Sequence, residues 1–96
     1  MKPSSALQSH RASIRLIVES HRAANARIFG SVLHGLDTEE SDLDILIDPT
    51  SETTMLDVAA IQIELEKLLS VSVDVLTPMA LPDSFRDRVL AEAKPV

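Results

Sequence analysis

Residues 28–48, IFGSVLHGLDTEESDLDILID, contain two apolar segments separated by a stretch rich in turn-forming and acidic residues. The first segment, residues 26–29, ends at Gly30 and predicts a β-strand, after which residues 31–34 predict a turn or a single helical turn. The second, residues 42–48, alternates apolar with mostly acidic side chains, the period of two that a strand requires. The side chains predicted to share its apolar face are Leu43, Ile45 and Ile47. This stretch therefore predicts two strands, the second with one buried face and one acidic face.

The flanking sequence predicts helices and one further strand. Apolar residues at helical spacing predict helices over about 5–23, 53–69 and 83–93. Ser4 or Ser5 is expected to cap the first of these helices. Alternating valines predict a strand over 71–76, which forms a βαβ unit with the second strand and should run parallel to it. We expect an α/β (α+β) fold in one domain, 1–96, with a small three-stranded mixed sheet and about four helices.

The composition limits the class of protein. The chain has 96 residues, of which 45% are hydrophobic and 25% charged, so wholesale disorder is excluded. It has no Cys, which excludes disulfides, a thiol nucleophile and a cysteine zinc site. No apolar run approaches the roughly 20 residues that span a bilayer. The first residues also lack the apolar stretch of a secretory signal, and we therefore expect a soluble, cytoplasmic protein.

The negative charge is concentrated in one segment. The formal net charge is −6, and residues 37–48 hold six acidic and no basic residues, while nine of each lie elsewhere. The sequence has no stripe of basic residues of the kind that binds nucleic acid. Direct nucleic-acid binding is therefore not expected. The acidic segment is either a solvated loop or a cation site. Within it, Asp37, Glu39 and Glu40 are interpreted as solvated loop acids, and Asp48 as a turn residue before Pro49.

Three aspartates are candidates for the cation site. Asp42 and Asp44 lie two residues apart on a predicted strand, so they project from the same face about 6.5–7 Å apart. Asp74 lies on the neighbouring predicted strand, and if it faces the same side the three carboxylates converge. Three converging anions raise one another's pKa values, and a divalent cation relieves their repulsion. Oxygen ligands alone favour Mg²⁺ or Mn²⁺, although the Asp-x-Asp pattern is common on ordinary surfaces.

A second signal precedes the aspartates. Gly30-Ser31, at the end of a strand and the start of a helical turn, offers free backbone N–H groups and a hydroxyl to an anion. Glycine also allows a phosphate to approach the backbone closely. A phosphate-binding turn facing metal-binding carboxylates is what phosphoryl or nucleotidyl transfer requires.

These residues resemble a known superfamily. The chain is similar to the signature of DNA polymerase beta-type nucleotidyltransferases. In it, Gly30-Ser31 is followed after ten residues by Asp42-Leu43-Asp44, and a further aspartate lies on a later predicted strand. The stretch 28–48, together with VSVDVLTPMAL at 71–81, resembles the minimal nucleotidyltransferase (MNT) proteins, including the MntA-type antitoxins of HEPN–MNT toxin–antitoxin systems. The resemblance implies transfer of AMP from ATP to a tyrosine of a partner HEPN-domain ribonuclease toxin, with which the chain would form a hetero-oligomer.

The resemblance also implies a role for each site residue. Gly30 and Ser31 would hold the nucleotide phosphates. Asp42 and Asp44 would ligate two Mg²⁺ ions. Asp74 would ligate the metal ion shared with the acceptor and help to deprotonate the acceptor hydroxyl, which would attack the α-phosphorus and release pyrophosphate.

One departure from the family pattern leaves alternatives open. Many relatives carry arginines directly after the Gly-Ser pair, where this chain has Val32, Leu33 and His34. The candidates for a replacement cation are Arg27, Arg86, Arg88 or a residue of a partner. A non-catalytic antitoxin that inhibits by stoichiometric binding is therefore an alternative, and transfer to a small molecule is another. The chain has no Tyr, so a tyrosine acceptor must belong to another protein.

Overall fold

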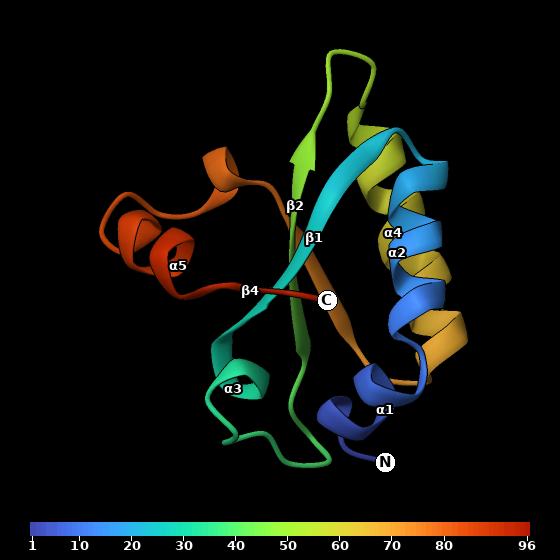
Figure 1. The fold of residues 1–96 in the computed structure, drawn as a ribbon, viewed down its shortest axis with the longest axis vertical. Helices are drawn as coiled ribbons and strands as arrows, with labels where there is room; N and C mark the ends of the chain where they lie inside the picture. Colours follow the sequence, from blue (N-terminus) through green and yellow to red (C-terminus); the bar gives the residue numbers. More distant parts are fainter.

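The computed structural model describes residues 1–96 as ten short elements (Figure 1). The helices are α1 (Pro3–Ser9), α2 (Arg11–Ser20), α3 (Gly30–Leu33), α4 (Met55–Leu69), the 3-10 helix η1 (Pro78–Ala80) and α5 (Arg86–Glu92). The strands are β1 (Ala23–Phe29), β2 (Leu43–Pro49), β3 (Val73–Leu76) and β4 (Lys94–Pro95). The three predicted strands and the helical turn after Gly30 are thus present. None of the helices combines the length and apolar character that crossing a membrane requires.

The sheet is mixed, as predicted, but it has four strands rather than three. Its order is β3-β2-β1-β4. β1 runs antiparallel to β2, and β2 runs parallel to β3 through the α4 crossover. The strand that the sequence analysis missed, β4, pairs only with Arg27 and Ile28 of β1. A strand of two residues that includes a proline has no alternating pattern from which it could be predicted.

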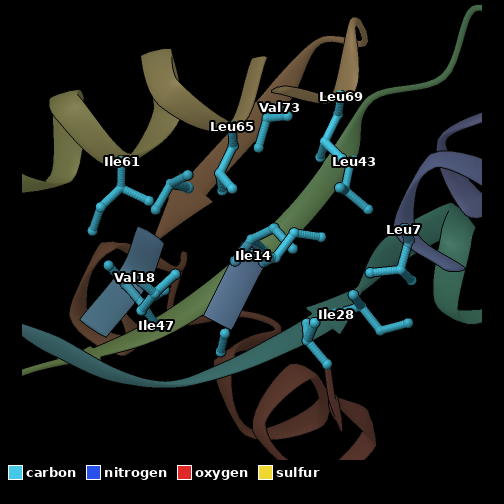
Figure 2. Packing of buried hydrophobic residues seen from close by; sticks show 14 of the residues in the cluster. Leu7, Ile14, Val18, Ile28, Leu43, Ile47, Ile61, Leu65, Leu69 and Val73 are labelled. Atoms are coloured by element: carbon cyan, nitrogen blue, oxygen red, sulfur yellow. The ribbon is translucent and has the colours of Figure 1, made fainter. Parts of the chain in front are cut away.

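The main core fills the space between one face of the sheet and three helices. Figure 1 shows α1, α2 and α4 on the same side of the sheet. The predicted inward residues of β2 are fully buried there, together with Ile14 of α2 and Ile61 and Leu65 of α4 (Figure 2). The three inward residues of β2 are Leu43, Ile45 and Ile47. This packing fixes which face of the sheet the intervening side chains must occupy.

The opposite face of the sheet carries a smaller apolar cluster under η1 and α5. Leu46 projects from β2 to this side, as its position in the alternation predicts, and it is fully buried there. The residues that pack with it in this cluster are Phe29, Leu81 and Val89. The middle of the second face is therefore apolar and covered, and its acidic residues lie on either side of this cover.

The first predicted helix, 5–23, is two helices that break at His10. α1 begins at Pro3 with Lys2 as its N-cap, so the expected cap by Ser4 or Ser5 is wrong. The Asp37 carboxylate instead accepts a hydrogen bond of 2.9 Å from the Ser4 N–H. Asp37 is buried, and this bond lowers its pKa; its interpretation as a solvated loop acid is therefore also wrong.

Helix α4 holds β3 in place. It begins with a capping box, in which the Thr54 hydroxyl accepts from the Asp57 N–H and the Asp57 carboxylate accepts from the Thr54 N–H. Further along the helix, the Glu66 carboxylate accepts a hydrogen bond of 3.1 Å from the N–H of Val73, the first residue of β3. Because α4 binds the outer edge of β3, it also fixes the position of Asp74.

Candidate active site

The register of β2 and β3 brings two of the predicted aspartates together. Asp44 lies directly opposite Asp74 in the parallel ladder. Their chain neighbours on both strands point into the main core, so both carboxylates project from the opposite face. Adjacent strands lie about 4.8 Å apart, which places the two side chains next to each other. Asp74 is exposed, whereas Asp44 is half-buried.

Asp42 lies at the margin of this pair. It precedes the first residue of β2 and is exposed. Its charge nevertheless contributes to the raised pKa of Asp44. No three acidic or histidine side chains lie close enough together to form a preformed metal site. The structure thus pairs Asp44 with Asp74 and leaves Asp42 beside them.

The electrostatics of Asp44 favour a bound cation. Burial, followed by the charges of Asp74 and Asp42, raises the pKa of Asp44 from 3.8 to about 6. Each cause penalises the carboxylate form, and a divalent cation would relieve the part due to repulsion. Mg²⁺ is commonly held by one or two carboxylates together with substrate phosphates. The donor set of this face therefore fits an ion that a nucleotide helps to bind.

The Gly-Ser turn lies directly against Asp44. Gly30 follows Phe29, which is the register partner of Asp44 on β1, and it opens α3 with a φ of +74°. A Cβ atom built on Gly30 would lie less than 3.0 Å from the Asp44 carboxylate. The turn and the carboxylates thus form one continuous site. The role of Ser31 toward a nucleotide stays a prediction.

The candidate basic residues are mostly engaged elsewhere. Arg27 forms an ion pair with Asp48, which lies within β2 and is therefore not the turn residue that was expected. Arg86 donates to the carbonyl oxygens of Pro78 and Leu81 at 2.8 and 2.6 Å, and thereby holds the segment after β3. Arg88 is exposed on α5. The cation expected near the Gly-Ser turn is thus not supplied by Arg27 or Arg86.

One contact between helices beside the site had no signal in the sequence. His34, at the end of α3, lies 3.3 Å from the Glu92 carboxylate of α5. An open hollow of about 400 Å³ lies at this junction, lined by Leu33, His34, Ala91, Glu92 and Lys94. A smaller hollow of about 140 Å³ lies between α2, β1 and the last residues. Neither hollow includes the aspartates, of which Asp42 and Asp74 are exposed and Asp44 is half-buried.

A mixed sheet that presents paired aspartates beside a Gly-Ser turn is the arrangement of the nucleotidyltransferase class. The chain belongs to the nucleotidyltransferase domain family, whose model matches residues 11–96. It is therefore a nucleotidyltransferase.

Two archaeal relatives have similar sequences. A proposed protein adenylyltransferase of Methanocaldococcus jannaschii, MJ0435, is 38% identical over 77 residues, which cover 80% of this chain and 83% of that protein. A second protein of the same organism with the same proposed activity, MJ0126, is 28% identical over 86 residues, covering 90% of this chain and 85% of that protein.

Two solved structures have similar folds. A structure described as that of a proposed minimal nucleotidyltransferase aligns with a TM-score of 0.86 and 36% identity, covering 97% of this chain and 95% of the other. A toxin–antitoxin complex with AMP-PNP contains a chain that aligns with a TM-score of 0.70 over 97% of this chain and 71% of the other. Because that second pair is 15% identical, it shows a shared fold alone. Together the two structures confirm the expected fold class.

Proposed function

We propose that this chain transfers AMP from ATP to a hydroxyl of a partner protein, and that the partner is a HEPN-domain toxin modified on a tyrosine. The observation that carries this proposal is the in-register pair of Asp44 and Asp74 beside Gly30. The two relatives proposed to be protein adenylyltransferases support a protein acceptor. The similar fold in a toxin–antitoxin complex with AMP-PNP agrees with an antitoxin role and an adenine nucleotide substrate.

The aspartates would have different roles in this reaction. Asp42 and Asp44 would hold two Mg²⁺ ions, and Asp74 would face the acceptor, because its side chain is exposed on the edge strand β3. Bound Mg²⁺ would supply neutralising charge between these carboxylates and the phosphate oxygens. Asp74 would help to accept the proton of the acceptor hydroxyl as its oxygen attacks the α-phosphorus. The bond from that phosphorus to the bridging oxygen breaks, and pyrophosphate leaves.

The remaining site residues would bind the nucleotide. Gly30 and Ser31 would line the phosphate position at the start of α3. The open face around Asp74 leaves space for a second protein to present the acceptor. No tyrosine exists in this chain, so self-modification on that residue type is impossible.

Mass spectrometry of the partner toxin after incubation with ATP and Mg²⁺ tests the proposal. Transfer of an adenylate to the acceptor hydroxyl oxygen increases the partner's mass by about 329 Da. Asp44→Asn should reduce labelling by at least about a hundredfold, because it removes a carboxylate that would hold the Mg²⁺ ions, and with them the positive charge that stabilises the transferring phosphate. Glu52→Gln, which removes one negative charge from the turn after β2, is the matched control and should label normally.

Titration of the chain against the toxin's ribonuclease activity distinguishes catalysis from simple binding. Protection well below a one-to-one ratio, dependent on ATP and lost in Asp44→Asn, supports the proposal. Equimolar protection that is unaffected by ATP would instead establish a stoichiometric antitoxin, since binding follows mass action.

A further inference from the structure

The two glycines of the chain have similar backbone conformations but different surroundings. Gly30 has a φ of +74° and Gly35 a φ of +69°, both in the region that favours glycine. A Cβ atom on Gly35 would meet nothing within 4 Å. A Cβ atom on Gly30 would lie closer to Asp44 Oδ2 than the 3.0 Å below which such contacts essentially do not occur, and 3.2 Å from Asp44 Cγ. Only Gly30 therefore has a steric reason, beyond its φ, to lack a side chain.

The backbone of Asp44 cannot move away from such a Cβ atom. Asp44 lies between Phe29 on β1 and Asp74 on β3, and its register with both strands is fixed. Its chain neighbours Leu43 and Ile45 are fully buried in the main core. The collision would therefore be relieved by rotation of the short Asp44 side chain, which turns the carboxylate out of its present position.

We propose that Gly30 is a positioning residue for Asp44: its missing side chain leaves the space that the Asp44 carboxylate occupies, and it thereby sets where that carboxylate can bind a divalent cation. The cation part of this statement rests on the proposed function, whereas the steric part does not. It differs from the expected role of the Gly-Ser turn, in which glycine serves the nucleotide phosphates.

Gly30→Ala and Gly35→Ala form a matched pair that tests the proposal. Both replace a glycine at positive φ, so both introduce similar backbone strain, and only Gly30→Ala adds the collision with Asp44. Calorimetry with MnCl₂ and no nucleotide then measures cation binding. Gly30→Ala should weaken Mn²⁺ affinity at least about tenfold, since ligand geometry must be held within about 0.5 Å, whereas Gly35→Ala should leave it near wild type.

A second measurement does not depend on any metal ion. The ¹³C resonance of the Asp44 side-chain carboxyl, recorded at pH 8 in EDTA, should shift in Gly30→Ala and stay unchanged in Gly35→Ala. Equal Mn²⁺ affinities for the two variants, or an unshifted Asp44 resonance in Gly30→Ala, would overturn the proposal. If Gly30→Ala weakens AMP-PNP binding in EDTA but leaves Mn²⁺ binding intact, Gly30 serves the phosphates instead.

These experiments also separate failure of this proposal from failure of the proposed function. A wild-type protein that binds no Mn²⁺ even when AMP-PNP is present would contradict the metal-dependent reaction. In that case the Asp44 resonance in the two glycine variants still decides whether Gly30 positions the carboxylate.

Discussion

Asp44→Asn removes one negative charge from the carboxylate face while it keeps the size and shape of the side chain. Burial and the two neighbouring aspartates raise the pKa of Asp44 from 3.8 to about 6. The folded protein therefore holds the Asp44 proton more tightly than the unfolded chain does. The stability contributed by this proton is complete below pH 3.8 and is lost as the pH rises to about 6. Asparagine, which stays neutral, avoids this loss.

The difference between the two pKa values sets an upper limit on the gain in free energy of unfolding from Asp44→Asn. At 1.36 kcal/mol for each pH unit, this limit is roughly 3 kcal/mol. Because Asp44 is only half-buried, solvent screening reduces the expected effect to about 1 kcal/mol. In EDTA, Asp44→Asn should thus be more stable than wild type by about 1 kcal/mol at pH 7.5, and nearly equal to it at pH 4.

Urea denaturation followed by circular dichroism measures both proteins at both pH values. Asp37 and Asp57, whose pKa values are lowered by hydrogen bonds from Ser4 and Thr54, are present in both proteins, and their contributions cancel in the comparison. A difference that does not change with pH, or a wild type more stable than the variant at pH 7.5, would refute the reasoning. Mg²⁺ should stabilise wild type more than Asp44→Asn.

Three other substitutions test contacts that hold the site in place. Thr54→Ala removes the α4 capping box and should cost about 1 kcal/mol in urea denaturation; an unchanged midpoint would contradict that role. Asp37→Ala removes the acceptor for the Ser4 N–H and should lower the thermal midpoint at pH 7. The effect should become smaller as the pH falls through the lowered pKa of Asp37, and an effect that persists in acid would argue against this role of the ionised carboxylate. Arg86→Met leaves the Pro78 and Leu81 carbonyls without their donor and should lower the free energy of unfolding by about 1–3 kcal/mol. Unchanged hydrogen exchange over 78–81 would contradict this expectation.

The amino-acid sequence by itself determined the local elements and their faces. The alternation in residues 42–48 predicted which side chains of β2 enter the main core, and the structure confirms that prediction. The helical pattern between β2 and β3 predicted a parallel pair, which is also confirmed. These features depend on neighbours two to four residues apart, so periodicity alone reveals them.

Elements without a periodic signal could not be located in this way. The two-residue strand β4 depends on pairing with β1, which lies far from it along the chain. The burial of Leu46 has the same cause, because α5 and the segment before it cover that part of β2. Each is decided by which segments pack together, and alternation along one strand carries no information about that.

The candidate site likewise has features that the sequence determined and features that only the tertiary structure decided. The sequence identified Asp42, Asp44, Asp74, Gly30 and Ser31 as candidates. Only the tertiary structure decided that Asp44 and Asp74 share one register position, that Asp42 stays at the margin, and that Gly30 lies against the Asp44 carboxylate. Strand register and side-chain proximity are set by the packing of whole elements, because a shift of one residue along a strand would reverse every face.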